Sequence, residues 1–251
     1  FILFNLSVIK INNMPHLILV RHGQSEWNQQ KRFTGWVDVD LTAEGKLEAC
    51  KSGELIKAEK LKIDYFFSSY QIRAINTLKL ILNTLRLKDL PIKAWQLNER
   101  HYGALTGLNK DEMKEKYGQK KINDFRRSWK IKPEPLNKNN PYHPINIESY
   151  KDIPKDFIPD TESLEDTYLR VVSYYKKNIE NKLKKNKNIL ISAHGNSIRA
   201  LCKYLFKLDN KKISLLEIPT GNPLLINLSA LNKITNCRYL DKNRSKDLLV
   251  F

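Results

Sequence analysis

Two short apolar runs that each end in a His-Gly pair constrain the fold of this chain most strongly. The first run, residues 17–20, continues directly into Arg-His-Gly at positions 21–23, and the second, residues 189–193, continues into His-Gly at positions 194–195. Unbroken apolar runs of this length are typical of strands buried on both faces of a parallel sheet. Open α/β sheets bind ligands at the carboxyl ends of such strands. We therefore expect both imidazoles at one edge of one sheet.

Helical and strand patterns alternate along the rest of the chain. Thr42 is a suitable N-cap for a helix to about Lys60, and Ser69 for a helix that carries Arg73 in or near its first turn. Further strands are expected at 65–68, 91–95 and 224–228, and further helices from residue 111, over 163–184 and over 197–206. The helix over 163–184 has an apolar stripe at spacings of three and four, which indicates core packing. This alternation predicts an α/β fold, a three-layer α/β/α sandwich with a mostly parallel sheet.

We expect residues 14–251 to form a single domain. A proline-rich excursion at about 130–160 holds six of the ten prolines and is either an ordered excursion or a lid. Met14 stands two residues before the first strand, so we expect it to be the natural start and residues 1–13 to be an extension outside the native protein. The chain stops at Phe251.

Composition narrows the class of protein without deciding it. The net charge of +17 fits nucleic acid, a membrane surface or small anionic substrates, while the lysine run 182–187 is typical of a solvated helix end. Three widely spaced cysteines without metal-ligand spacing favour a reduced, cytoplasmic protein. No apolar run approaches the roughly 20 residues of a membrane span, so we expect no membrane partner. Aromatic residues are not interleaved with a basic stripe, and we therefore expect no nucleic acid partner either.

The residues at the predicted sheet edge suit phosphoryl transfer. A neutral imidazole is a nucleophile near pH 7, so His22 is the candidate nucleophile. His194, more useful when protonated, is a second donor to the phosphoryl oxygens, together with the Gly195 amide. Arg21 and Arg73 complete a cationic cradle, the latter beside a helix N-terminus that itself attracts phosphate. The chain has no GxxxxGK[ST] motif and no paired-carboxylate magnesium site, so we predict a reaction without ATP and without metal.

Several further motifs resemble the cofactor-dependent phosphoglycerate mutases of the histidine phosphatase superfamily. They are RHGQSEWN at 21–28, RFTGW at 32–36, NERHYG at 98–103, LTGLNK at 105–110, RRS at 126–128 and AHGNSIR at 193–199. The matching runs extend from about residue 17 to residue 228. The resemblance implies a phosphoglycerate mutase-like fold and a phosphohistidine intermediate charged by 2,3-bisphosphoglycerate. It also implies small-molecule phosphoglycerates as substrates and a homodimer or homotetramer.

The same resemblance assigns roles that spacing alone does not. It implies that His22 is phosphorylated and that Glu99 exchanges the proton of the substrate hydroxyl. Without the resemblance, nothing in the sequence favours Glu99 over Glu26 or Glu44 for this role. It implies that the substrate is lined by Gln24, Ser25, Asn28, Thr34, Gly35, Arg100, His101, Tyr102, Lys110, Arg126, Arg127, Gly195 and Asn196. Clustered Arg and Lys suit a ligand that carries two phosphates and a carboxylate.

Two departures and two alternatives stay open at this point. Gln24 stands where relatives commonly have Glu, and relatives usually continue into a lysine-rich C-terminal tail that covers the site. A shorter tail would favour phosphatase leakage over mutase turnover, because a lid excludes water from a phosphohistidine. The first alternative is a bisphosphoglycerate synthase or phosphatase, although Ser25, Thr34 and Gly35 look like the mutase versions of these positions. The second is a non-catalytic protein that binds anions or nucleic acid.

Overall fold

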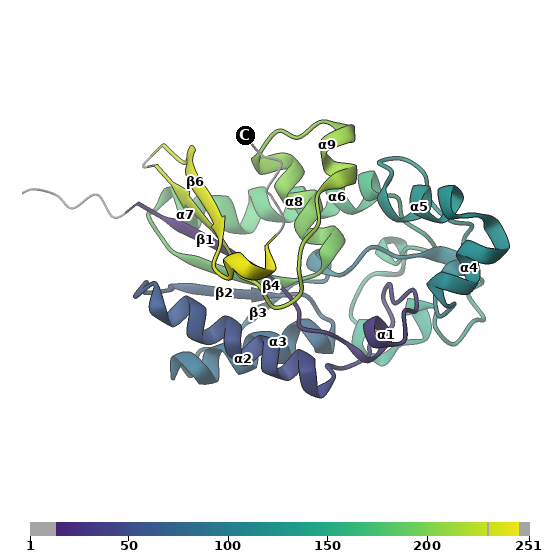
Figure 1. Ribbon diagram of the computed structural model, residues 1–251, viewed down its shortest axis with the longest axis horizontal. Helices are drawn as coiled ribbons and strands as arrows, with labels where there is room; N and C mark the ends of the chain where they lie inside the picture. The colour runs from purple at the N-terminus through teal and green to yellow at the C-terminus, as the bar shows by residue number, and fades with distance from the viewer. Residues whose placement is uncertain (1–13, 230, 246–251) are drawn as a thin grey trace, which may run out of the picture.

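A six-stranded mixed sheet organises the protein, and the computed structural model describes residues 14–229 and 231–245 (Figure 1). The strand order is β3-β2-β4-β1-β5-β6. The strands are β1 (His16–Arg21), β2 (Tyr65–Ser68), β3 (Ile92–Lys93), β4 (Ile189–Ala193), β5 (Leu224–Leu228) and β6 (Ile234–Tyr239). β3, β2, β4 and β1 are parallel, whereas β5 pairs antiparallel with β1 and β6 pairs antiparallel with β5. The prediction of a mostly parallel sheet is therefore confirmed. β6 is a strand that the sequence does not predict, because its mostly polar, partly exposed residues give no clear strand pattern.

The two His-Gly strands lie side by side, as the sequence predicts. β1 and β4 pair in parallel with Arg21 opposite Ala193, and the His22 amide continues the ladder by donating to the Ala193 carbonyl at 3.0 Å. His194 follows Ala193 directly. Both imidazoles are consequently delivered to the same edge of the sheet by neighbouring strands.

Helices cover both faces of the sheet and make the three layers (Figure 1). α2 (Ala43–Ala58) and α3 (Ile72–Leu85) lie on one face, and α6 (Leu164–Tyr174) and α8 (Gly195–Leu205) lie on the other. Leu17 and Leu19 point into the core under α6 and α8, while Ile18 and Val20 point into the core under α2 and α3. Burial on both faces explains why the strand reads as continuously apolar, and each such side chain contributes about 1.5–3 kcal/mol.

The ends of the helices follow local signals in most places. Thr42 caps α2 by accepting a hydrogen bond from the Gly45 amide, as predicted. The expected Ser69 cap of α3 is wrong: the helix starts at Ile72, and its N-cap residue is Gln71. The Ser69 hydroxyl instead lies 2.8 Å from Nε2 of His194, which follows β4 and is a partner that local spacing does not reveal.

The amphipathic stripe of residues 163–184 is buried as predicted, although the helix is not uniform. α6 passes through a π-helical turn, Tyr175–Ile179, into α7 (Glu180–Lys184), and Ser163 caps its start. The remaining helices are α1 (Glu26–Gln29), α4 (Lys110–Tyr117), α5 (Gln119–Arg127) and α9 (Asn210–Leu215). Of the described helices, none is both long and apolar enough to cross a membrane.

The proline-rich excursion is ordered by short 3₁₀ turns and by aromatic packing. Its turns are Pro144–Asn146, Glu148–Tyr150 and Lys155–Phe157. Tyr150 is buried against Trp36, and its hydroxyl donates to the Trp36 carbonyl. The excursion therefore supports the loop that follows β1.

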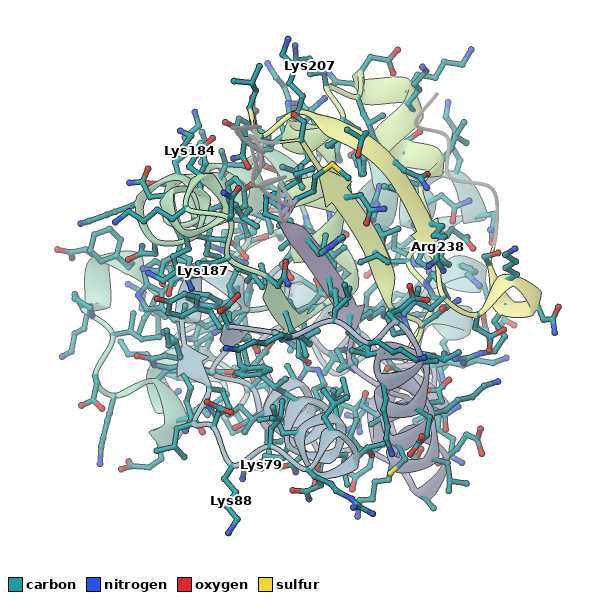
Figure 2. The ribbon with its side chains drawn as sticks, turned by 90° about the vertical axis from the view of Figure 1, so that its left-hand side faces the viewer. Lys79, Lys88, Lys184, Lys187, Lys207 and Arg238 are labelled. Atoms are coloured by element: carbon teal, nitrogen blue, oxygen red, sulfur yellow. The ribbon has the colours of Figure 1, made fainter. Side chains whose placement is uncertain are left out.

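The basic side chains labelled in Figure 2 come from separate segments of the chain, and the five lysines among them are exposed. Three of them are paired: Lys184 with Glu180, Lys187 with Asp64, and Arg238 with Glu59. The six labelled residues are Lys79, Lys88, Lys184, Lys187, Lys207 and Arg238. This arrangement agrees with the interpretation of the lysine run as a solvated helix end. The expected extension 1–13 and the end of the chain, residues 246–251, lie outside the described residues.

Candidate active site

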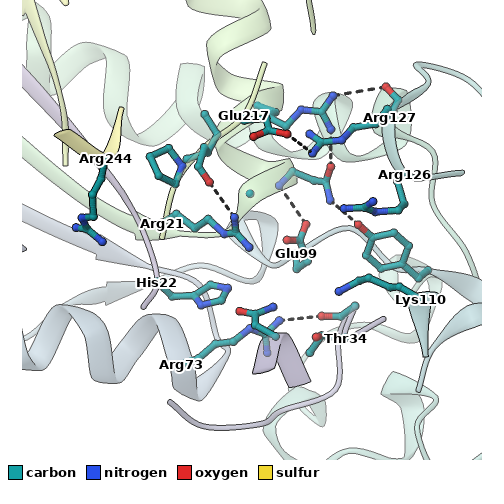
Figure 3. A pocket seen from close by; sticks show the side chains of 18 residues that line it. Arg21, His22, Thr34, Arg73, Glu99, Lys110, Arg126, Arg127, Glu217 and Arg244 are labelled. Carbon is teal, nitrogen blue, oxygen red and sulfur yellow. Dashed lines mark hydrogen bonds and ion pairs between the residues drawn. The ribbon is translucent and has the colours of Figure 1, made fainter. Parts of the chain in front are cut away.

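A polar cavity of about 270 Å³ opens at the carboxyl edge of the parallel strands (Figure 3). Side chains from β1, α3, α8 and the loops between them converge on it, and most of the charged ones are basic. The lining residues are Arg21, His22, Asn28, Thr34, Gly35, Arg73, Glu99, Tyr102, Lys110, Arg126, Arg127, Gly195, Asn196, Arg199, Glu217, Ile218, Pro219 and Arg244. The cavity lies at the sheet edge where the sequence places the two imidazoles, and the function of this cavity stays a prediction.

His22 is held as a neutral imidazole with one nitrogen left available. It is buried, and its Nδ1 donates to the Gly23 carbonyl at 2.7 Å, since a carbonyl oxygen can only accept. Burial, and then the nearby charges of Arg73 and Arg21, lower the pKa of His22 well below its usual value. A neutral ring with Nδ1–H has its lone pair on Nε2, so His22 presents a nucleophilic nitrogen.

His194 lies next to His22, with the two ring centroids 4.9 Å apart. Its Nε2 lies 2.8 Å from the Ser69 hydroxyl, while its Nδ1 is buried without a hydrogen-bond partner among residues 14–229 and 231–245. Burial, together with Arg73 and His22, lowers the pKa of His194 well below its usual value. An unpaired buried nitrogen is costly, and His194 Nδ1 is one that the described residues leave without a partner, although His194 itself is not among the side chains that line the cavity.

Two arginines border the imidazole pair and are oriented by backbone carbonyls. The Arg73 guanidinium, buried in the first turn of α3, donates to the carbonyls of Val37 and Gly35 at 2.8 and 2.9 Å. Arg21 donates to the Ile218 carbonyl at 2.8 Å, and its Nε has no hydrogen-bond partner in the described part of the chain. A carbonyl orients a guanidinium without neutralising its charge. Both side chains are thus prepared to bind an anion.

Glu99 contributes a carboxylate to this otherwise basic wall. Its Oε1 accepts hydrogen bonds from the Asn196 amide at 3.2 Å and from the Arg100 amide at 2.8 Å. The Asn196 side chain in turn donates to the Tyr102 hydroxyl at 3.0 Å. Glu99 and His22 therefore line the same cavity (Figure 3).

The outer part of the cavity is strongly cationic. Lys110, Arg126 and Arg127 come from the ends of α4 and α5, and burial is the main cause that lowers the pKa of Lys110 and of Arg127. Arg127 also pairs with Glu217 at 3.3 Å. Clustered cations of this kind match an extended, multiply charged anion.

Four residues assigned to substrate by the resemblance do not line the cavity. The Gln24 side-chain oxygen accepts from the Thr42 hydroxyl, and Ser25 caps α1. Arg100 is buried with its guanidinium 4.7 Å from the Tyr102 ring centroid, and it donates to the Phe125 carbonyl. His101 is buried, and its Nδ1 accepts from the Gly103 amide. These side chains pack behind the wall, where Arg100 Nε and Nη1 and His101 Nε2 have no hydrogen-bond partner among the described residues.

The structure also brings in residues that sequence reasoning missed. Arg199 lines the cavity and donates to Asn196 Oδ1 at 2.9 Å, while burial lowers its pKa to about 9. Its only sequence signal is its place at the end of the AHGNSIR motif. Glu217 and Arg244 reach the rim from near the C-terminal end of the described chain, and no local pattern singles them out. Within residues 14–229 and 231–245, no group of three or more His, Cys, Asp or Glu side chains is arranged to hold a metal ion.

A family comparison agrees with the paired histidines and their arginine cradle. A model for the histidine phosphatase superfamily (branch 1) matches residues 17–153 and 140–229. The chain therefore belongs to this superfamily.

Curated relatives narrow that placement. A 2,3-bisphosphoglycerate-dependent phosphoglycerate mutase of Pelagibacter ubique (strain HTCC1062) is 74% identical over 238 residues, which cover 95% of this chain and 100% of the relative. One of the same description from Caulobacter sp. (strain K31) is 51% identical, over 94% of this chain and 98% of the relative. Within the superfamily, the chain thus belongs to the 2,3-bisphosphoglycerate-dependent phosphoglycerate mutases.

A solved structure agrees with the fold. A mycobacterial glucosyl-3-phosphoglycerate phosphatase superposes with a TM-score of 0.66 at 20% identity, over 90% of this chain and 96% of that one. At this identity the likeness concerns the fold alone.

Proposed function

We propose that the chain interconverts 3-phosphoglycerate and 2-phosphoglycerate, as in glycolysis and gluconeogenesis, with His22 as a phosphorylated nucleophile. The observation that carries the proposal is the neutral His22 ring, which lines one basic cavity with Arg21 and Arg73. His194 is not among the lining side chains, but it is buried against His22 with the two ring centroids 4.9 Å apart. The close curated relatives carry the name of this activity. We further propose that residues 14–251 act as one catalytic domain.

The residues present fit 2,3-bisphosphoglycerate as the primer. Its two phosphates and its carboxylate match a wall that is mostly basic, and the unpaired Arg21 Nε and His194 Nδ1 are donors or acceptors still to be satisfied. When bound, the primer supplies the phosphoryl group that charges His22. One phosphate would lie against Arg21, Arg73, His194 and the Gly195 amide. The far end would lie among Asn28, Thr34, Gly35, Tyr102, Lys110, Arg126, Arg127 and Asn196.

His22 carries out the transfer by attack of its Nε2 lone pair on phosphorus. The N–P bond forms as the bond from phosphorus to the leaving oxygen breaks, while the cations and His194 stabilise the equatorial oxygens. His194 is neutral in these surroundings, and the charge of a bound phosphoryl group favours its protonated form. The cradle supplies all the charge stabilisation in this scheme, so we propose a reaction without a metal ion.

Glu99 is the proposed acid–base group. As a phosphoryl group leaves for His22, Glu99 donates a proton to the departing alkoxide, and it takes a proton from the attacking hydroxyl in the return step. Phosphorylated His22 gives its phosphoryl group to one hydroxyl of the phosphoglycerate and then takes the phosphoryl group from the other. The phosphate of the product has thus moved, and His22 is phosphorylated again for the next cycle. Glu99 suits this role because its carboxylate faces the cavity and is oriented by two backbone amides.

The decisive assay is mutase turnover of the purified protein with and without 2,3-bisphosphoglycerate, in EDTA, beside a His22→Ala variant. We expect turnover that depends on the bisphosphate, resists EDTA and disappears in the variant. Bisphosphoglycerate synthesis or hydrolysis as the main activity would support the sister-enzyme alternative instead. RNA binding with steep salt dependence and no turnover would support a binding protein.

We propose a cytoplasmic homodimer or homotetramer as the working form. Support comes from exposed Ile92 in the edge strand β3 and exposed Leu90 just before it. Exposed Phe157 and Leu169 also line a groove together with Trp95. Exposed apolar side chains next to an unpaired strand edge are typical of association surfaces. Light scattering coupled to size exclusion measures the mass directly, and a monomer at working concentration would contradict this assignment.

A further inference from the structure

The loop that carries Glu99 is held from behind by a buried arginine of α6. Arg170 lies on the side of the loop away from the cavity, and its side chain is only 10% exposed. Its guanidinium donates to the backbone carbonyls of Gln96, Asn98 and Glu99 at 2.7, 2.9 and 3.0 Å. Three carbonyls within four residues thus converge on one side chain.

The same guanidinium forms a bidentate pair with Glu162. Arg170 Nε donates to Glu162 Oε1 at 2.6 Å, and Nη2 donates to Oε2 at 2.9 Å. Together with the three carbonyls, these bonds use all five N–H donors of the guanidinium. A lysine has three donors and no planar fork, so it cannot reproduce this set.

Glu162 closes the arrangement on the far side of Glu99. Its Oε2 accepts from the His101 amide at 2.8 Å, and its own amide donates to the His101 carbonyl at 3.1 Å. The Glu162 side chain is 5% exposed. The pair therefore holds the backbone on both sides of Glu99, from Gln96 to His101.

We propose that Arg170 and Glu162 are positioning residues that hold the Glu99 carboxylate in register with His22, an inference that rests on the function proposed above. Neither side chain lines the cavity, so neither touches substrate. Their effect is on proton transfer, because the carboxylate depends on the backbone that carries it. A displacement of about 1 Å at such a group lowers the rate about 100-fold.

Two substrates separate this role from a merely structural one. Phosphoglycerates leave as alkoxides and need a proton, whereas p-nitrophenyl phosphate releases a nitrophenolate that does not. We expect Arg170→Lys to lower kcat for 3-phosphoglycerate by about 100-fold, with KM little changed. The rate at which p-nitrophenyl phosphate phosphorylates His22, measured as the nitrophenolate released in the same step, should change by no more than a few-fold. Glu162→Gln should shift the ratio of the two rates in the same direction.

The control is Arg238→Lys, which alters an arginine–glutamate pair of equal length, 2.6 Å, whose residues do not line the cavity. It should change neither rate. Equal losses on both substrates, or a lowered melting temperature with an unchanged ratio of rates, would overturn the positioning role. Wild-type protein that releases nitrophenolate but shows no mutase turnover with 2,3-bisphosphoglycerate would overturn the proposed function, a distinguishable failure.

Discussion

Gly23 is the position where one added methyl group should most directly disturb the nucleophile. A Cβ at Gly23 would lie 2.1 Å from the carbonyl oxygen of Gly45, in the first turn of α2, whereas ordinary contact begins at 3.4 Å. The backbone angles of Gly23 are not in the left-handed region, so the conflict is one of space alone. Gly23→Ala therefore isolates the effect of pushing this loop away from the helix.

The displacement reaches His22 through a hydrogen bond. The Gly23 carbonyl accepts from His22 Nδ1 and so sets which ring nitrogen attacks phosphorus. Relief of the overlap needs a shift of about 1 Å, which lowers the rate about 100-fold when it falls on a reacting group. Overpacking should also cost about 1–3 kcal/mol of the free energy of unfolding. We expect both losses in Gly23→Ala.

Gly53, a glycine of α2, the helix whose Gly45 would meet the added Cβ of Gly23, separates the two effects. A Cβ at Gly53 would lie 2.6 Å from the Thr84 side chain, between α2 and α3 and away from the cavity residues. Gly53→Ala should lose stability without a comparable loss of activity. The assays are quenched-flow formation of the phosphoenzyme and urea unfolding of both variants. Unchanged phosphoenzyme formation in Gly23→Ala, or an equal loss in Gly53→Ala, would refute the reasoning.

Two further outcomes follow from the charges of the site. Arg73→Lys keeps the charge but loses the fork that two carbonyls orient, so the rate of phosphoenzyme formation should fall about 100-fold, while Lys79→Arg on the exposed face of the same helix should not change it. Burial lowers the pKa of His22 and His194, and lowers that of His101 to about 3. Below the usual imidazole value of 6.5, the unfolded chain then binds more protons than the native state. The free energy of unfolding should therefore fall as the pH is lowered from 7 toward 5, and urea unfolding that shows rising stability over this range would contradict these directions.

The sequence alone determined the parts of this protein that depend on contiguous residues. The buried runs before His22 and His194 predict neighbouring strands because burial on both faces demands an unbroken apolar run. Thr42 marks the start of α2, and the stripe over 163–184 marks a buried helix, because capping and periodicity are local. The role expected for Glu99 came from family resemblance instead.

Only the tertiary structure decided which distant residues meet. Ser69 is a plausible helix cap by spacing, yet strand pairing turns it toward His194. Arg170 belongs by sequence to a core helix, and packing of that helix against the loop makes it the support of Glu99. Arg100, charged and within a motif, packs behind the wall, where its Nη2 donates to the Phe125 carbonyl of α5 while Nε and Nη1 have no partner among the described residues. In each case the partner is remote in sequence, and the free energy of satisfying a buried polar group selects it only after the chain has folded.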